Sequence, residues 1–268
     1  MTEKDKILTV ENLSVIFSDS GASKRVIKDI SFTLHKGEIL GIVGESGSGK
    51  SVTVMTIMGL IDSPPLIENT GSIIYKDLDL LTLKNRDYRK IRGKEISYIF
   101  QEPMTALNPV FTIGDQLTET IREHNRGMSK KDAIKKSISL LEEVNIPDPV
   151  QRMKNYPHEL SGGMRQRAMI ATALSCNPKI LLADEPTTAL DVTIQAQILS
   201  LLKDLVKKRD MSLIFITHDL GVIAEIADNV LVMKDGEIVE RGGVVDIFHK
   251  PTHPYTIDLL SYIGGREL

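Results

Sequence analysis

The feature that most constrains the fold of this chain is the segment Gly44–Ser51, with the sequence GESGSGKS. It fits the pattern G-x-x-x-x-G-K-[ST], in which glycines let successive backbone N–H groups turn inward around phosphate groups. An apolar run, Ile39–Val43, precedes it, and a helical segment from about Lys50 to Leu60 follows it. This order of strand, loop and helix is the context that the pattern requires. The segment therefore predicts a phosphate-binding P-loop in an α/β protein.

Each residue type in the loop has a chemical reason to be there. The expected phosphate-binding residues are Gly44, Glu45, Ser46, Gly47, Ser48, Gly49, Lys50 and Ser51. The helix that starts near Lys50 adds its positive end to the attraction for phosphate. Lys50 is expected to reach the β- and γ-phosphates of a nucleotide, and the Ser51 hydroxyl is expected to bind Mg²⁺.

Strands alternate with helices along the rest of the chain. Short β-rich runs open it between residues 7 and 34. Later strands are expected at Ile96–Phe100, Ile180–Ala183 and Ser212–Ile216, and hairpins at Gly71–Leu81 and Val230–Val239. Helical patterns cover about Thr112–Val144, Gly163–Ser175 and Val192–Lys208. This alternation predicts a parallel sheet covered by helices, with a helical insertion between its two halves.

Two adjacent carboxylates, Asp184 and Glu185, end the apolar strand Ile180–Ala183. Because side chains alternate along a strand, the two are not expected to share one role. Beside a P-loop, one carboxylate can hold the Mg²⁺ shell and the next can polarise the attacking water. We assign Asp184 to the metal and Glu185 to the water.

Composition excludes several classes of protein. The formal net charge of −3 gives no general attraction to nucleic acid, so no nucleic-acid partner is expected. The single cysteine, Cys176, cannot form an internal disulfide, which fits a reducing compartment. The charged N-terminus does not predict a signal peptide, and no apolar run is long enough to predict a transmembrane helix. A role at a membrane would therefore require membrane partners on other chains.

The segment Leu160–Gln166, LSGGMRQ, resembles the signature motif of the ABC-transporter ATPases, and the resemblance runs nearly end to end. Ser161, Gly162 and Gly163 would offer a hydroxyl and backbone N–H groups at a helix start, which is an anion site. The resemblance implies that they close on the γ-phosphate of ATP held by an opposite subunit. It also implies a RecA-like P-loop NTPase core with an antiparallel β subdomain and an inserted α-helical subdomain.

Further positions match motifs of the same family. Gln101 matches the Q-loop glutamine that contacts Mg²⁺ or water, Asp191 the D-loop, and His218 the switch histidine near the γ-phosphate. Phe17 fits the aromatic that stacks on adenine, with a core phenylalanine as the alternative. The resemblance thus implies ATP and Mg²⁺ as cofactors, catalytic roles for Glu185, His218 and Gln101, and metal binding by Ser51, Gln101 and Asp184.

Two segments resemble the peptide/nickel importer group within that family: Phe100–Pro109, FQEPMTALNP, and Pro251–Thr256, PTHPYT. This resemblance implies two permease subunits, a solute-binding protein, and a second ATPase subunit that is a different chain or a copy of this one. A permease loop is expected to dock on the helical insertion near Gln101. The implied location is the cytoplasmic face of a bacterial or archaeal membrane.

The expected organisation is an ABC ATPase domain at 5–247, with a helical subdomain inserted at about 103–167, and a short tail at 248–268. No iron–sulfur cluster is expected, since the tail lacks the cysteines that hold one in some importer ATPases. The predicted function is ATP hydrolysis that powers import of di- or oligopeptides. Nickel, metallophore or opine import stays an alternative, and an exporter ATPase would share the core motifs but not the two importer segments.

Overall fold

The computed structural model describes residues 5–19, 22–61, 66–188 and 190–261. The chain forms two compact units. The first unit contains residues 1–89 and 210–268, and the second contains residues 90–209. Within the described ranges, no helix is both long and apolar enough to cross a membrane.

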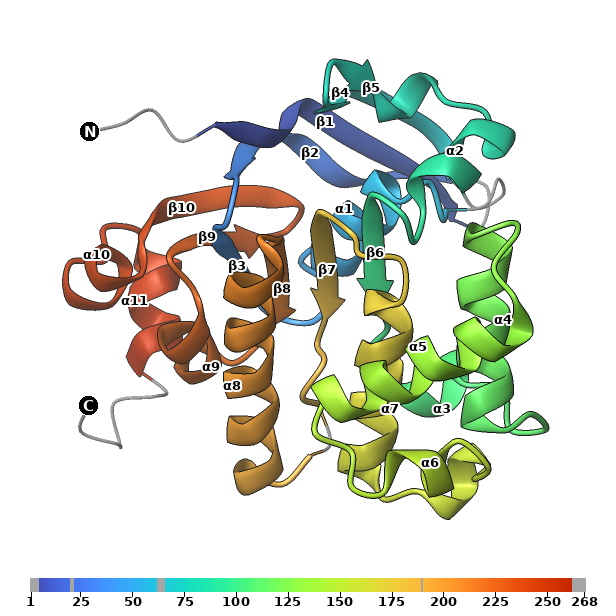
Figure 1. Ribbon diagram of the computed structural model, residues 1–268. Helices are drawn as coiled ribbons and strands as arrows, with labels where there is room; N and C mark the ends of the chain where they lie inside the picture. Colours follow the sequence, from blue (N-terminus) through green and yellow to red (C-terminus); the bar gives the residue numbers. More distant parts are fainter. Residues whose placement is uncertain (1–4, 20–21, 62–65, 189, 262–268) are drawn as a thin grey trace. The chain divides into compact units, whose positions relative to one another are not determined.

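An antiparallel sheet occupies the N-terminal part of the first unit (Figure 1). Its strands, in the order β2-β1-β4-β5, are β1 (Lys6–Asp19), β2 (Ala22–His35), β4 (Leu66–Tyr75) and β5 (Leu78–Asp79). The hairpin predicted at Gly71–Leu81 turns at Lys76 and Asp77, which join β4 to β5, and both residues have positive φ, 48° and 64°. Two positive φ values are what a two-residue type I′ hairpin loop requires.

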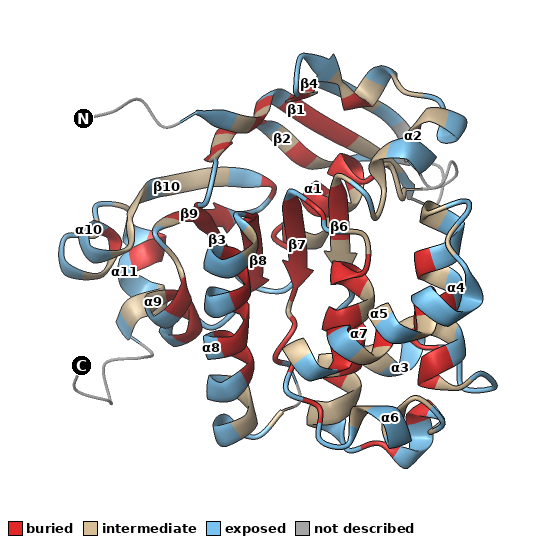
Figure 2. Cartoon of the chain, viewed as in Figure 1, coloured by how far each residue is buried: buried red, intermediate tan, exposed pale blue. Residues whose placement is uncertain are grey.

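The first unit also contains the strand that leads into the P-loop. That strand, β3 (Ile39–Val43), pairs in parallel with β8 (Ser212–Thr217) and with β9 (Asn229–Lys234). Strand β10 (Glu237–Gly243) adds to β9 in antiparallel fashion. All five residues of β3 are buried (Figure 2), as the two-sided apolar run predicted. The parallel sheet expected around the P-loop is confirmed.

Short helices complete the first unit. They are α1 (Lys50–Ile57), η1 (Leu80–Thr82), α9 (Leu220–Ile226), α10 (Val244–His249) and α11 (Pro254–Ser261), while α2 (Asn85–Ile91) runs across the unit boundary. Helix α9 packs closely on β3, because a Cβ added at Gly41 would lie 2.7 Å from the Cδ1 of Ile223. Helix α1 was predicted from the sequence, whereas α9, α10 and α11 were not.

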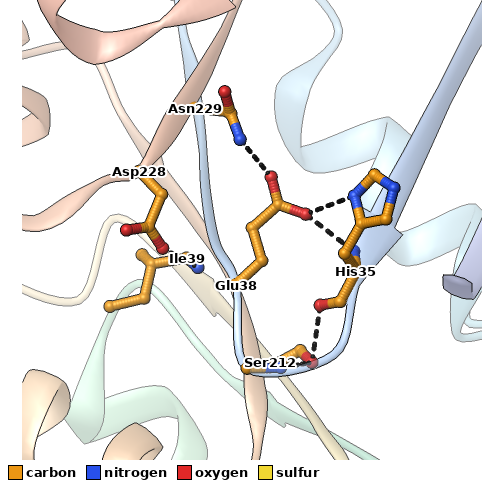
Figure 3. A network of polar contacts seen from close by, with 7 residues as sticks. His35, Glu38, Ile39, Ser212, Asp228 and Asn229 are labelled. Atoms are coloured by element: carbon orange, nitrogen blue, oxygen red, sulfur yellow. Dashed lines mark hydrogen bonds and ion pairs between the residues drawn. The ribbon is translucent and has the colours of Figure 1, made fainter. Parts of the chain in front are cut away.

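A polar network fixes the start of β3 (Figure 3). The carboxylate of Glu38, only 2% exposed, accepts hydrogen bonds from Asn229 Nδ2 (2.6 Å) and from the backbone N–H and Nδ1 of His35 (2.7 and 2.9 Å). Ser212 Oγ donates to the backbone oxygen of His35 at 3.0 Å, and Asp228 accepts from the N–H of Ile39 at 2.8 Å. The network joins β2, β3, β8 and β9, so it holds in register the strand that ends at the P-loop.

The second unit contains a strand pair and a group of helices (Figure 1). Strands β6 (Ile96–Ile99) and β7 (Ile180–Asp184) pair in parallel, with Ile99 opposite Ala183. The helices are α3 (Pro103–Ala106), α4 (Ile113–His124), α5 (Lys130–Glu143), α6 (Pro149–Arg152), η2 (Pro157–Glu159), α7 (Gly162–Leu174) and α8 (Val192–Arg209).

The helical stretch predicted from Thr112 to Val144 consists of two helices, α4 and α5. Gly127 has a φ of 109° in the connection between them, and the Ser129 side chain caps α5 by accepting from the N–H of Asp132 at 3.1 Å. Arg209, at the end of α8, forms an ion pair with Glu143 at the end of α5. The Ser129 cap therefore fixes the start of α5, and the ion pair links the C-terminal ends of α5 and α8.

Candidate functional site

The phosphate-binding loop runs from the end of β3 to the start of α1, and its glycines fit it tightly against neighbouring backbone. A Cβ added at Gly44 would lie 2.1 Å from the backbone oxygen of Met233 on β9. One added at Gly49 would lie 2.6 Å from Ile27 Cδ1, and Gly49 also has a φ of 103°. Larger residues at these positions would displace the loop, so the spacing of the two glycines has a local structural cause.

Hydrogen bonds hold the loop in a closed turn. The buried Lys50 donates through Nζ to the backbone oxygens of Gly44 (2.8 Å) and Glu45 (2.9 Å). Gly236, in the turn between β9 and β10, donates its N–H to the backbone oxygen of Ser48 at 3.0 Å. Lys50, which is expected to contact phosphate, is therefore already hydrogen-bonded to the loop that would surround the phosphate.

Two features of the loop fit a phosphate group. The hydroxyl of Ser48 is buried and has no hydrogen-bond partner within the described part of the chain. A Cβ added at Gly47 would have nothing within 4 Å, so the loop is open on that side. An anion with several oxygens can approach at Gly47 and accept from buried donors, which satisfies groups that are costly to leave unpaired.

His218 and Phe17 belong to the same unit as the loop. His218 follows β8 and is exposed, and the next residue, Asp219, caps α9 by accepting from the N–H of Gly221 at 2.7 Å. This cap fixes the backbone on the C-terminal side of His218. Phe17 lies near the end of β1, opposite Lys24 of β2, and is partly exposed. Partial exposure is compatible with both readings of Phe17, adenine stacking and core packing.

Asp184 ends β7 in the second unit and is buried, with 4% exposure. The hydroxyl of Tyr98, on the neighbouring strand β6, donates to Asp184 Oδ2 at 2.7 Å. Burial, together with the charge of Asp184 and this hydrogen bond, raises the pKa of Tyr98. The phenol therefore stays protonated and keeps the carboxylate in one orientation.

Glu185 directly follows β7, the strand that ends at Asp184. Its φ of 44° is in the left-handed region, which non-glycine residues rarely occupy outside functional sites and turns. Its Oε2 accepts hydrogen bonds from Gln101 Nε2 (3.1 Å) and from Thr188 Oγ1 (2.9 Å). The structure thus brings together Gln101 and Glu185, two residues to which the sequence analysis gave catalytic roles.

The signature segment forms the start of α7. Ser161 is the N-cap, and its hydroxyl oxygen accepts from the N–H of Met164 at 3.3 Å. A Cβ added at Gly163 would lie 2.8 Å from Ile194 Cγ2 on α8, whereas one at Gly162 would meet only Leu190 Cδ2 at 3.7 Å. Gly163 is therefore needed for helix packing, and Gly162 has more space around it.

Asp191 caps α8, because its Oδ1 accepts from the N–H of Ile194 at 2.9 Å. Asp191 thus has a structural role that the D-loop assignment did not include.

A cavity of about 230 Å³ lies between the start of α7 and the segment after β6, and it is lined among others by Gln101, Gly162 and Gln166. Gln166 is 1% exposed, and its Nε2 has no partner within the residues described.

The predicted residues divide between the two units. The P-loop, His218 and Phe17 belong to the first, and Gln101, Asp184, Glu185, Asp191 and the signature residues Ser161, Gly162 and Gly163 belong to the second. Sequence reasoning missed Tyr98 and Thr188, which hold the two carboxylates. Thr188 had a local signal, since it follows Glu185 by three residues, but Tyr98 is 86 positions from Asp184.

A P-loop that follows a buried parallel strand, together with an acid pair at the end of another such strand, defines the class of protein as a P-loop ATPase. The ABC transporter family model matches residues 27–188. The chain belongs to the ABC transporter family, and it is an ATP-binding cassette of that family.

Individual relatives agree with this membership. The chain is 54% identical over 264 residues to the dipeptide transport ATP-binding protein DppD of Bacillus subtilis, covering 98% of this chain and 78% of the relative. It is 54% identical over 267 residues to the oligopeptide transport ATP-binding protein OppD of the same organism, covering 100% and 74%. Among solved structures, a dimeric post-hydrolysis state of the ATP-binding cassette MJ0796, bound to ADP and Pi, superposes with a TM-score of 0.79 at 28% identity, covering 89% of this chain and 99% of that one.

Proposed function

We propose that this chain is the subunit that hydrolyses ATP to power an ABC importer of di- or oligopeptides. The observation that carries the substrate class is the 54% identity to dipeptide and oligopeptide transport proteins over nearly the whole chain. The importer segments Phe100–Pro109 and Pro251–Thr256 support the same reading. The ABC ATPase domain is proposed to span 5–247, with the helical subdomain at about 103–167 and the importer tail at 248–268.

Nucleotide binding is assigned to the P-loop. Lys50 and the backbone of Gly44–Ser51 are proposed to hold the phosphates, and the buried Ser48 hydroxyl supplies one more donor. Phe17 is proposed to stack on the adenine. These groups are proposed to contact ATP both before and during hydrolysis. They therefore contribute to the affinity for ATP more than to the rate of hydrolysis.

Mg²⁺ is proposed to be held by Ser51, Gln101 and Asp184. Mg²⁺ prefers hard oxygen ligands and usually takes one or two carboxylates, with water and substrate phosphates completing its shell. When bound, the ion neutralises charge on the phosphates. Tyr98 supports this role by orienting Asp184.

Hydrolysis is assigned to Glu185, which is proposed to orient and polarise the attacking water. Gln101 and Thr188 both donate to its Oε2, and these bonds fix the carboxylate before substrate binds. A preorganised acceptor of this kind costs no reorganisation during the reaction. His218 is proposed to lie near the γ-phosphate and to complete the catalytic set.

A second ATPase subunit is proposed to complete each nucleotide site. Ser161, Gly162 and Gly163 of one subunit would meet the γ-phosphate bound by the P-loop of the other, with Asp191 at the same interface. Binding of ATP would then favour the closed dimer, and loss of the γ-phosphate would allow it to open. The second subunit is proposed to be a related but different chain, with a second copy of this chain as the other possibility.

The permease subunits are proposed to bind the second unit. Several large apolar side chains around α3, α4 and α6 are exposed: Met104, Val110, Phe111 and Val150. Phe111 and Val150 also line a cavity of about 1050 Å³ formed by α4, α5 and α6. Exposed apolar groups beside a hollow are typical of a protein-binding surface. Through these permease contacts, the chain is proposed to lie at the periphery of the membrane, on its cytoplasmic face.

The test is ATPase activity of this chain assembled in lipid with its permeases and partner ATPase. The cognate binding protein is added either loaded with peptide or loaded with a nickel chelate, and the unloaded form is the control. Stimulation by the peptide-loaded form is expected. Stimulation only by the metal-loaded form would assign the chain to nickel or metallophore import, and activity that ignores every loaded form would favour an exporter.

A further inference from the structure

The C-terminal segment reaches the phosphate-binding loop through one side chain, that of Tyr255. Its hydroxyl oxygen accepts a hydrogen bond from the backbone N–H of Glu45, with an N···O distance of 3.0 Å. Tyr255 lies on α11 and is only 5% exposed. Both residues belong to the first unit, so this contact lies within one compact body. None of the roles proposed above uses Tyr255.

Tyr255 and Lys50 hold the same peptide group of the loop. The peptide bond between Gly44 and Glu45 has its carbonyl oxygen bonded to Lys50 Nζ at 2.8 Å and its N–H bonded to Tyr255 at 3.0 Å. Because a peptide group is planar, its C=O and N–H turn together. Rotation of this plane would therefore break both hydrogen bonds, and the tyrosine hydroxyl opposes any rotation that turns the carbonyl away from Lys50.

The surrounding residues hold Tyr255 in place. The Glu240 carboxylate accepts from the N–H and hydroxyl of Thr252 (2.7 and 2.8 Å) and from the N–H of His253 (3.1 Å). The N–H of Tyr255 donates to His253 Nδ1 at 3.2 Å. The ammonium of Lys234 lies 4.6 Å from the centre of the Tyr255 ring, a cation–π contact. The segment is thus pinned to β10 just before the residue that touches the loop.

The protonation state of Tyr255 suits a position beside phosphate. Burial raises the pKa of its phenol. The side chain therefore stays neutral around pH 7 and accepts from Glu45 without adding negative charge. An anionic oxygen at this place would repel the phosphates that the loop is proposed to hold.

We propose that Tyr255 is a positioning residue for the nucleotide site: its hydroxyl fixes the Gly44–Glu45 peptide and thereby the orientation of Lys50 toward the phosphates. This inference rests on the proposed nucleotide binding by the P-loop. The importer tail then has a function in ATP binding, through one hydroxyl group rather than through general packing.

The test is Tyr255→Phe in the full chain, which removes the hydroxyl and keeps the ring. The loss of one hydrogen bond predicts a KM for ATP raised about fivefold, with kcat changed by less than about twofold. Partial unfolding would instead lower the active fraction, and with it kcat, at unchanged KM. Tyr156→Phe is the control, since it removes a phenol hydroxyl from an exposed side chain in the other unit, and its KM is expected to stay at the wild-type value.

A second variant tests whether the segment that Glu240 holds against β10 affects ATP binding through the Tyr255 hydroxyl. Glu240→Gln weakens the contacts to Thr252 and His253 and is expected to raise KM in the same direction. In the Tyr255→Phe background it should raise KM no further, because the interaction it supports is already lost. Additive effects of the two substitutions would contradict the proposed route.

The remaining outcomes distinguish a failure of the role proposed for Tyr255 from a failure of the proposed ATP binding. Wild-type protein that binds ATP, with a Tyr255→Phe variant of unchanged KM, would overturn the positioning role and leave nucleotide binding intact. A variant with lower kcat and unchanged KM would also overturn it. Wild-type protein that binds no ATP, measured by direct titration, would overturn the proposed function itself.

Discussion

Single glycines shape the phosphate-binding loop, and Gly44 is the most closely packed of them. A Cβ at this position would lie 2.1 Å from the backbone oxygen of Met233, and backbone cannot give way as a flexible side chain can. We expect Gly44→Ala to weaken ATP binding by about tenfold, as the loop shifts to relieve the overlap. Titration with ATP and Mg²⁺ measures the effect.

The matched control for this variant is Gly37→Ala. Gly37 also has positive φ, 70°, but an added Cβ there would meet nothing within 4 Å. Gly37→Ala should lower the midpoint of thermal unfolding slightly, because of backbone strain, and leave the affinity for ATP unchanged. Equal ATP affinity in wild type and Gly44→Ala would show that close packing at Gly44 does not set the shape of the loop.

The second prediction for a single residue concerns Glu185. Glu185→Gln should keep ATP binding and lower kcat by at least about 100-fold, because an amide keeps the shape of the side chain but cannot accept a proton from water. The closed dimer should accumulate when ATP is added. Phosphate release in a single turnover, together with gel filtration, tests both points. A variant with the normal rate of hydrolysis would remove Glu185 from the role proposed for it.

Short-range patterns in the sequence were enough to predict the chemistry of the loop and of the acid pair. The P-loop residues are contiguous, and Asp184 and Glu185 directly follow a strand, so their roles can be read without tertiary contacts. Tyr98 and Tyr255 could not be found in this way. Each acts on a residue far away in the chain, and no local pattern shows that β6 lies beside β7 or that the start of α11 contacts the phosphate-binding loop.

At the scale of elements, the pinning of the C-terminal segment to β10 depends on the ionised carboxylate of Glu240. Burial alone would raise the pKa of this group, but hydrogen bonds that include those from Thr252 and His253 lower it from 4.5 to about 2. A lowered pKa means that the folded state favours the ionised form, so the stabilisation is present above about pH 4.5 and is lost between pH 4.5 and 2.

The resulting prediction compares wild type with Glu240→Gln by urea unfolding at several pH values. Wild type should be the more stable at pH 6, and the difference in the free energy of unfolding should shrink as the pH falls below 4.5. A difference that stays constant across this range would mean that the charge of Glu240 does not contribute to holding the segment.

Some element limits were predictable from apolar patterns, but the long stretch Thr112–Val144 is two helices, and several short helices were not predicted. Strand β3 and helix α8 agree with their sequence patterns within one residue. Helices α9, α10 and α11 have only 6 to 8 residues, too few to show a clear period. For α9 the capping residue Asp219, followed by apolar residues, was the signal that could have found it.

At the scale of the whole molecule, the residues proposed for nucleotide binding and for hydrolysis are distributed over both compact units. The first supplies the P-loop and His218, and the second supplies Gln101, Asp184 and Glu185. Family membership and the fold were predictable because the motifs lie in a fixed order along the chain. The transported substrate left no such motif, since binding protein and permeases on other chains are proposed to select it.

The central claim, that ATP hydrolysis by this chain drives peptide import, is tested most directly by uptake of a labelled dipeptide into proteoliposomes. The vesicles contain the permeases and the partner ATPase, with either the wild-type chain or Glu185→Gln. Peptide-loaded binding protein is supplied on the outside and ATP with Mg²⁺ on the inside. The account predicts accumulation of peptide with the wild-type chain and none above background with the variant. Equal accumulation with both chains, or none with wild type despite active ATP hydrolysis, would contradict it.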